Sequence, residues 1–319
     1  MKKLLIILLF MAVELFAITP KEYQQDLGIG INVNWCNFKK YVDREYYKDG
    51  VKLFRELGFK HVRIRFNGAL YRAQPQKMLT ALKNTVDASL KAGLIPIITY
   101  IDSDLAQHPN SKNINYSVEV WSEIAKMFKE YPQTLSYDLY IEPNKKLGKR
   151  VKKLLRFYRE SILAIRLLDK DKILFIAPSH IANPYYLDEL LPIVQDSRLN
   201  HKLMIEWHFY ASGPSKTNKK KLWSSGTAYE KELIDKKIAY AHAWCKKHSL
   251  YSWMGALMPG DYNHGDNFTQ AQQIAFIGYT LKRLKDYSIP AAINAGQQFY
   301  DYKTKRLKRE AVLREILKY

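Results

Sequence analysis

The sequence predicts a single (β/α)8 barrel, and three observations support this prediction. Short apolar runs alternate with longer amphipathic stretches along the chain, which is typical of parallel βαβ units. Eight such units fill about 300 of the 319 residues, a size that suits a closed barrel. Residues 18–319 contain no linker and no break in composition, so we expect them to form one domain.

The eight expected strands are short runs, several of them rich in β-branched or aromatic residues. They cover residues 28–34, 61–66, 94–101, 136–142, 172–177, 203–210, 250–257 and 289–294. Helical patterns cover residues 44–57, 78–91, 118–129, 147–168, 186–191, 229–247, 271–284 and 305–317. An open, doubly wound sheet is the alternative, but Gly28 and Gly30 lack the third glycine of a dinucleotide-binding loop.

The first 17 residues have the pattern of a secretory signal peptide. Lys2 and Lys3 precede an unbroken apolar run over residues 4–13, and Ala17 offers a small residue for cleavage. The run is short for a membrane span, although an uncleaved amino-terminal anchor is the alternative. We therefore expect a mature chain of residues 18–319, secreted or periplasmic, without a stable membrane span.

The chain is strongly basic, with 51 Lys and Arg against 31 Asp and Glu and a net charge of +20. The positive residues concentrate in three runs, at 145–153, 216–221 and 303–309, which contain few aromatic residues. This pattern favours a basic surface over a nucleic-acid site, and export argues against a nucleic-acid partner. A weak attraction to anionic cell-surface polymers is compatible with it.

The sequence predicts no metal, no cofactor and no disulfide. Cys36 and Cys245 fit no zinc motif and are expected on a strand end and an outer helix, which makes a bridge improbable. His180, His208, Asp261 and His264 could be gathered as ligands, but no spacing on one element supports a metal site.

Polar and aromatic residues stand at the carboxyl ends of the expected strands, where a barrel carries its chemistry. Sugars need many hydrogen-bond donors and acceptors, together with aromatic planes for their C–H faces, so this rim suits a carbohydrate. The rim residues are Asn32, Asn34, Trp35, Arg63, Arg65, Tyr100, Asp102, Asp104, Glu142, Ser179, His180, Asn183, Glu206, His208, Tyr210, Met258, Asp261, Tyr262, Asn263 and Asn294.

Five fragments on successive strands occur in an order that resembles glycoside hydrolase family 5, the cellulase-type barrels. The fragments are Gly30-Ile-Asn32, Gly58-Phe-Lys-His-Val-Arg63-Ile, Glu142-Pro143, His208-Phe-Tyr210 and Met254-Gly255. The resemblance covers nearly the whole mature chain. It implies hydrolysis of O-glycosidic bonds in a β-linked polysaccharide or oligosaccharide.

The resemblance implies that Glu142 is the general acid/base, but the family's second glutamate falls at Ala256. Ile141 likewise stands where the family motif has asparagine. A retaining glycosidase needs two carboxyl groups about 5–5.5 Å apart, and alanine cannot supply one.

Two interpretations follow from Ala256. In the first, another carboxylate takes the second role, with Glu206 as the main candidate and Asp261 and Asp102 as others; a longer separation would then give inversion. In the second, the chain is a catalytically weakened or inactive barrel that binds glycans at the cell surface. Glu206 could also be a buried carboxylate held by Arg63, because an unpaired buried guanidinium would be costly.

The remaining candidates are substrate-binding residues. The resemblance assigns sugar contacts to His208 and Tyr210, although His208 could instead be a satisfied core histidine. We expect Trp223 to be a sugar platform, whereas Trp207 and Trp253 should pack against helices by strand alternation. The full predicted binding set is Arg63, His208, Tyr210, Asn34, Trp223 and Asn294.

Overall fold

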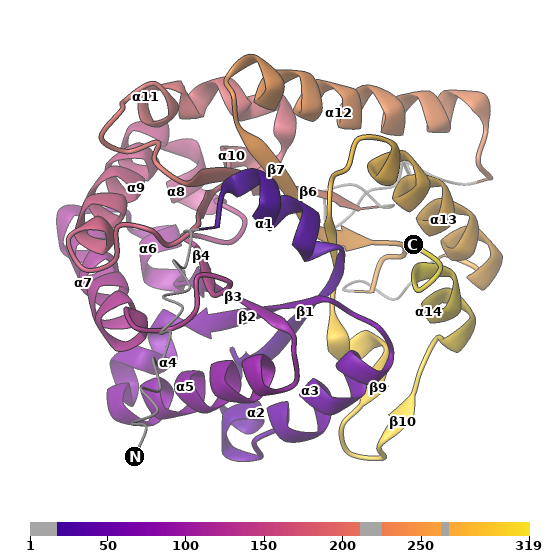
Figure 1. Ribbon diagram of the computed structural model, residues 1–319, viewed down its shortest axis with the longest axis horizontal. Helices are drawn as coiled ribbons and strands as arrows, with labels where there is room; N and C mark the ends of the chain where they lie inside the picture. The colour runs from indigo at the N-terminus through magenta and orange to yellow at the C-terminus, as the bar shows by residue number, and fades with distance from the viewer. Residues whose placement is uncertain (1–17, 211–224, 263–267) are drawn as a thin grey trace, which may run out of the picture.

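The computed structural model describes residues 18–210, 225–262 and 268–319, and these form a closed barrel of eight parallel strands (Figure 1). Each strand pairs with the next in chain order, and β8 pairs back onto β1. The predicted (β/α)8 fold is therefore confirmed. The expected signal peptide, residues 1–17, lies outside the described residues. The strands are β1 (Ile29–Cys36), β2 (His61–Asn67), β3 (Ile95–Ile101), β4 (Ser136–Asp138), β5 (Leu174–Ile176), β6 (Leu203–Tyr210), β7 (Tyr251–Met258) and β8 (Ala291–Ile293).

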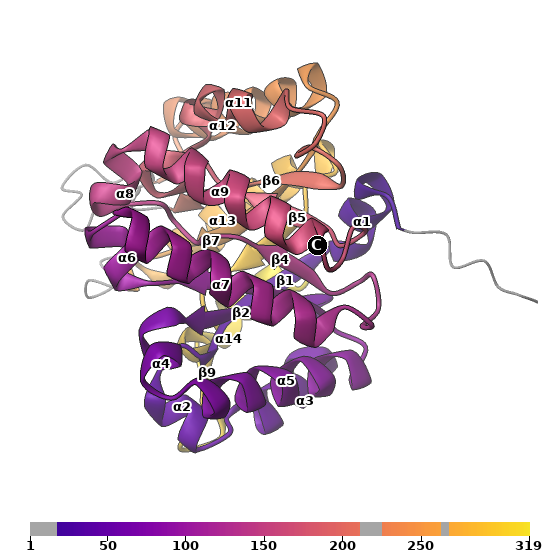
Figure 2. The ribbon, with the colours of Figure 1, turned by 90° about the vertical axis from the view of Figure 1, so that its left-hand side faces the viewer.

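Helices surround the barrel and join its strands. Figure 2 shows α5, α7 and α9 along one side, with α6 and α8 at one end of the molecule and α1 at the other. None of the helices within the described ranges combines the length and the apolar character needed to cross a bilayer. The helices are α1 (Pro20–Leu27), α2 (Lys39–Asp43), α3 (Tyr47–Glu56), α4 (Gly68–Ala73), α5 (Pro75–Lys91), α6 (Ser103–Gln107), α7 (Ser111–Phe128), α8 (Lys145–Lys149), α9 (Val151–Arg166), α10 (Ser179–Ala182), η1 (Pro184–Leu190), α11 (Leu191–Val194), α12 (Ala228–Lys247), α13 (Gln270–Asp286), η2 (Gly296–Gln298) and α14 (Glu310–Ile316).

Three helix predictions were wrong in their extent, and one of them, the helix expected over 118–129, begins earlier, at Ser111. The helix expected over 147–168 is divided at Arg150, whose φ of −116° and ψ of 67° lie outside the helical region. The last helix begins at Glu310 rather than at 305, because a hairpin of β9 (Tyr300–Asp301) and β10 (Arg306–Leu307) occupies the preceding residues. The Asp301 carboxylate accepts hydrogen bonds from two backbone N–H groups in this turn and so favours it over a helix.

The amino end of the barrel is closed by α1, and the interior behind it is apolar. Thr19 begins this helix with a capping box, and the Tyr23 hydroxyl donates to Ser136 Oγ at 2.7 Å. Tyr23 and Leu27 pack in one cluster with Phe175 and Trp253. The polar chemistry is thereby left to the opposite, carboxyl end of the strands.

Trp253 points into the barrel, so the prediction that it packs against helices was wrong. Its strand neighbour in the pairing register is Glu206, which also points inward. A register irregularity follows, since Trp207 pairs with Met254 but His208 pairs with Ala256. The extra residue, Gly255, reverses the alternation, and both Trp253 and Ala256 therefore lie on the inner face. Trp207 belongs to the outer cluster, as expected.

Candidate functional site

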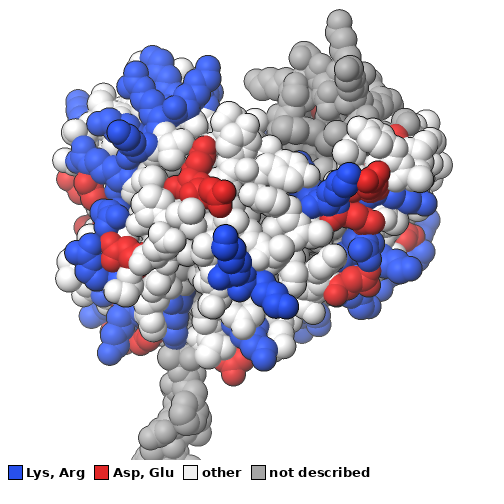
Figure 3. All heavy atoms as spheres, turned by 90° about the horizontal axis from the view of Figure 1, so that it is seen from above, with Lys and Arg blue, Asp and Glu red and all other residues white. Residues whose placement is uncertain are grey.

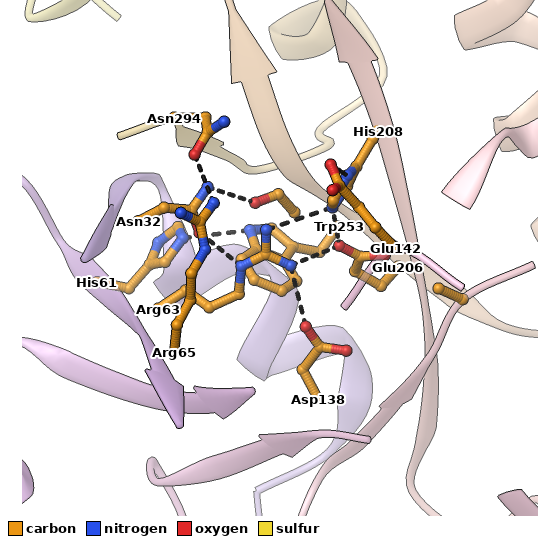
Figure 4. A network of polar contacts seen from close by, with 12 residues as sticks. Asn32, His61, Arg63, Arg65, Asp138, Glu142, Glu206, His208, Trp253 and Asn294 are labelled. Atoms are coloured by element: carbon orange, nitrogen blue, oxygen red, sulfur yellow. Dashed lines mark hydrogen bonds and ion pairs between the residues drawn. The ribbon is translucent and has the colours of Figure 1, made fainter. Parts of the chain in front are cut away.

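Arg63 lies at the centre of a buried polar network inside the barrel (Figure 4). Its guanidinium donates to Asn32 Oδ1 at 2.5 Å, to Asp138 Oδ2 at 3.0 Å and to Glu206 Oε1 at 2.6 Å. A fourth contact, at 3.3 Å, joins it to His208 Nε2. The predicted contact between Arg63 and a carboxylate is confirmed. The side chains of Arg63, Asp138 and Glu206 have no exposed surface, so this network lies beneath the mouth of the barrel.

Strands β2, β4 and β6 supply these three charged side chains, and the inward layers of a barrel are built from alternate strands in this way. Burial and the charge of Glu206 raise the pKa of Asp138 to about 6, although Arg63 opposes the shift. Asp138 was not among the predicted site residues. It lies two positions from Tyr140 and four from Glu142 in the expected strand 136–142, so the alternation that places Glu142 could also have found it.

Glu142 lies above this network, in the loop after β4 rather than at the end of the strand. Its side chain is 26% exposed. Glu142 Oε1 accepts a hydrogen bond from the Tyr210 hydroxyl at 2.6 Å and lies 2.8 Å from His208 Nδ1. The other nitrogen of His208 contacts Glu206 Oε1. The imidazole therefore bridges one carboxylate at the mouth and one in the interior.

The electrostatics of this bridge favour a charged histidine and an ionised Glu142. Burial lowers the pKa of His208, but the negative charges and hydrogen bonds of Glu206 and Glu142 outweigh it and raise the pKa. Burial raises the pKa of Glu142, but the hydrogen bonds from His208 and Tyr210 and the charges of His208 and Arg65 lower it to about 2. Glu142 is therefore an anion at neutral pH.

A second chain of contacts crosses the mouth through Arg65, which lies two residues after Arg63 and on the same face of β2. Its guanidinium donates to Asn34 Oδ1 at 3.1 Å and to Asn294 Oδ1 at 2.5 Å. Asn294 Nδ2 in turn lies 3.4 Å from the Tyr210 hydroxyl. The structure thus brings together three of the predicted binding residues, Asn34, Asn294 and Tyr210, and adds Arg65 to them.

The position expected for the second glutamate carries only a methyl group. Ala256 is buried and packs with Tyr210 and Met258 at the end of β7. Within the described residues, the two carboxylates that contact His208 are Glu142 and Glu206, and of these Glu142 alone reaches the surface. The geometry thus supplies one accessible carboxylate next to a cluster of donors.

Of the other candidates, Asp102 lies apart from this cluster and Trp223 lies outside the described residues. Asp102 is the N-cap of α6 and pairs with Arg72 at 3.1 Å, so its carboxylate is already satisfied. Trp223, the predicted sugar platform, falls outside the described residues. In the three described ranges, no group of three or more His, Cys, Asp or Glu side chains could hold a metal ion.

The fold and the site together define a parallel barrel with a carboxylate–histidine–tyrosine cluster at the carboxyl end of its strands. The sequence matches the family described as "Cellulase (glycosyl hydrolase family 5)" over residues 22–292. The chain therefore belongs to glycosyl hydrolase family 5, and the resemblance drawn from its strand motifs is confirmed.

Individual relatives agree with this assignment. Endoglucanase H of Acetivibrio thermocellus is 28% identical over 139 residues, a match that covers 40% of this chain and 15% of that protein. Endoglucanase Cel5A from Thermotoga maritima superposes with a TM-score of 0.77 at 20% identity, covering 94% of this chain and all of that one. The cellulose synthase subunit Z from Clostridioides difficile gives 0.76 at 16% identity, covering 91% and 99%. At these identities the two structures show a shared fold.

Proposed function

We propose that this protein binds a β-linked glucan across the carboxyl end of its barrel, and that Glu142 is the general acid/base of any hydrolysis of its O-glycosidic bonds. The observation that carries the proposal is the position of Glu142, partly exposed at the mouth and held by His208 and Tyr210. Membership of a cellulase family supports a β-glucan as ligand, as do the names of the relatives, which include endoglucanases.

The chemistry assigned to Glu142 is transfer of a proton to the leaving oxygen, followed by activation of water. In the free protein the carboxyl is ionised, with a pKa of about 2, so it must gain a proton before it can act as an acid. A second carboxylate nearby would raise that pKa. With alanine at position 256, the carboxylate that would raise the pKa of Glu142 is missing, and so is the nucleophile of a retaining reaction.

We assign Glu206 to positioning rather than to attack on a sugar. Its side chain has no exposed surface, and Glu206 Oε1 already contacts Arg63 and His208. This carboxylate keeps His208 charged, and His208 in turn keeps Glu142 in place. Under this proposal Glu206 does not take the second catalytic role that the sequence allowed for it.

The second candidate is a glycan-binding protein without turnover, and Ala256 is the observation that favours it. Binding needs the donors and acceptors of Arg65, Asn34, Asn294 and Tyr210, and these are in place. Hydrolysis needs a second carboxyl group as well. We therefore expect binding to be readily measurable and turnover to be slow.

The test measures reducing-end release and calorimetric binding with cello-oligosaccharides, mixed-linkage β-glucan, mannan and chitin oligosaccharides. Glu142→Gln should reduce turnover by about 10²–10⁴-fold and change the affinity little, since the amide keeps the shape but cannot exchange a proton. Glu119→Gln, on the exposed face of α7, is the matched control and should behave like the wild type.

The outcomes separate the two candidates. If the wild type binds a β-glucan but releases no reducing ends, hydrolysis is rejected and the binder is retained. Ala256→Glu, checked for folding by circular dichroism, should then raise turnover if the mouth has kept a hydrolase shape. If the wild type neither binds nor cleaves any glycan of the panel, both candidates are rejected.

We also propose that the protein is exported after cleavage behind Ala17. The pattern of residues 1–17 supports this, and α1 with its N-cap Thr19 begins directly beyond the site, so cleavage leaves the described fold intact. Mass spectrometry of the protein from cells should find Ile18 at the amino terminus. Leu8→Arg, which interrupts the apolar run, should leave the precursor uncut; a wild-type protein that retains Met1 would refute the proposal.

A further inference from the structure

Unpaired positive charge gathers around the mouth of the barrel, beside Glu142. The segment 145–153 carries six basic residues, and most of them are exposed. None of the six makes an ion pair with a residue in the described part of the chain. Figure 3 shows Lys and Arg side chains gathered at its upper left, with few acidic side chains among them. The six are Lys145, Lys146, Lys149, Arg150, Lys152 and Lys153.

This basic segment is fixed next to the site. Helix α8 begins three residues after Glu142, and Gly148 packs so closely on the backbone of Pro143 that an added Cβ would lie 2.6 Å from the Pro143 carbonyl oxygen. The charges therefore have a defined position relative to Glu142. A ligand that reaches Glu142 passes within range of them, because the Debye length at physiological salt is about 8 Å.

Arg65 adds a cation inside the mouth that has no carboxylate partner. Both of its hydrogen-bonded nitrogens donate to neutral amides, those of Asn34 and Asn294, and its Nε is buried without a hydrogen-bond partner in the described chain. Burial and the neighbouring charge of Arg63 lower the pKa of Arg65 to about 10, so it is still a cation at neutral pH. Each of its two terminal nitrogens has one further N–H, and the side chain is partly exposed, so Arg65 can donate to a carboxylate at the mouth.

The carboxylates nearby do not balance these cations. Asp102 and Asp104 are both paired with Arg72, at 3.1 and 2.6 Å. Glu206 is buried against Arg63. Position 256, where the resemblance places a further glutamate, is alanine. Of the two carboxylates that contact His208, Glu142 is therefore the accessible one, and neither it nor the Arg72 pair forms an ion pair with Arg65 or with the segment 145–153.

We propose that the glycan taken by this site carries carboxylate groups, as a β-linked polymer of uronic acid or of partly oxidised glucose does. The proposal rests on the glycan-binding function proposed above and names its substrate class. Arg65 binds a carboxylate of the sugars next to Glu142, and the segment 145–153 attracts the parts of the chain that extend along α8.

The experiment compares two ligands that share a backbone and differ in charge, cellohexaose and the β-1,4-linked hexamer of glucuronic acid. Calorimetry on the full mature chain should find the acidic hexamer at least tenfold tighter at about 0.1 M salt. The advantage should decrease at about 1 M salt, where the Debye length is about 3 Å. Lys146→Gln/Lys149→Gln/Arg150→Gln should weaken the acidic hexamer and leave cellohexaose unchanged.

The matched control is Lys60→Gln/Lys91→Gln/Lys170→Gln, which removes three exposed charges near the amino ends of the strands. It should leave both affinities as in the wild type. An equal loss in both triple variants would mean that only net charge matters and would overturn the proposal. A sulfated cellohexaose or a short DNA duplex that binds as tightly as the acidic hexamer would overturn it too, in favour of general attraction to polyanions.

The same titrations distinguish a failure of this proposal from a failure of the glycan-binding function on which it rests. Equal affinity for the two hexamers supports glucan binding and overturns the preference for carboxylates. Tighter binding of the acidic hexamer supports the preference, whether or not cellohexaose binds measurably. If neither hexamer binds, both proposals are overturned.

Discussion

Arg63→Met tests whether the interior of the barrel is organised around one guanidinium. The change removes the donor shared by Asn32, Asp138 and Glu206 and leaves two carboxyl groups without exposed surface and without their cation. Breaking a buried ion pair on one side typically costs about 3–5 kcal/mol of unfolding free energy. We expect a loss in that range at pH 7, measured by urea denaturation.

The pH dependence distinguishes lost charge pairing from lost packing. Without Arg63, the pKa of Asp138 in the folded state should rise further above that in the unfolded chain, because the cation that opposes the shift is gone. A raised carboxyl pKa means that the folded state binds more protons, so the variant should regain stability as the pH falls. This carboxyl recovers up to about 1.4 kcal/mol per pH unit, and the loss should shrink by roughly 2 kcal/mol between pH 7 and pH 5.

Two further variants complete the test. Arg63→Met/Glu206→Gln should be more stable than Arg63→Met at pH 7, because it removes one of the unpaired charges. Arg198→Met is the exposed control: this side chain is 75% exposed beside Asp196, and its loss should cost less than about 1 kcal/mol. An Arg63→Met protein with the wild-type midpoint, or with the same loss at pH 7 and pH 5, would refute the reasoning.

Three other predictions concern neighbouring features of the structure. Gly255→Ala should lower the free energy of unfolding by about 1–3 kcal/mol, because a Cβ there would lie 2.0 Å from Glu206 Oε1; an unchanged urea midpoint would contradict that contact. Cys36 and Cys245 are free and buried, and burial raises the pKa of each to about 12, so a maleimide should label them only after unfolding. Glu142→Gln should destabilise the protein at pH 7 by at most about 3 kcal/mol, since the depressed pKa stabilises the fold above the ordinary value of 4.5; denaturation curves should show this difference disappearing as the pH falls from 4.5 towards 2.

The local elements and their order could be predicted from the sequence because they depend on periodicity. Residues 203–210 were expected as a strand and form β6 with the same limits, since the run is apolar and aromatic without a break. The strand 136–142 was expected to be longer than β4, which ends at Asp138. The pattern of residue types along the chain does not show where hydrogen bonding to the neighbouring strand ends. That end point determines where the loop that contains Glu142 begins.

The sequence predicted a contact of Arg63 with Glu206 or Glu142, because a buried guanidinium needs an anion, and the structure shows the contact with Glu206. Asp138 as a second partner, and the bridge that His208 makes between Glu142 and Glu206, required the closed barrel, which brings β2, β4 and β6 to a common centre. The closed barrel also determines which of the two carboxylates, Glu142 or Glu206, reaches solvent. The sequence treated Glu142 and Glu206 as a possible catalytic pair, whereas burial separates them into a surface and an interior group.

The sequence by itself determined the barrel, its order of strands and the resemblance to glycosyl hydrolase family 5, since each depends on residue type and spacing. Only the tertiary structure showed which residues of β7 point into the barrel. The irregularity at Gly255 reverses the alternation of inward and outward side chains, which a prediction from the sequence takes to be constant along a strand. The tertiary structure also decided the charge of the mouth. Whether Arg65 is paired with an anion depends on which carboxylates lie within a few ångströms, and residues far apart in the chain meet at that distance only in the folded protein.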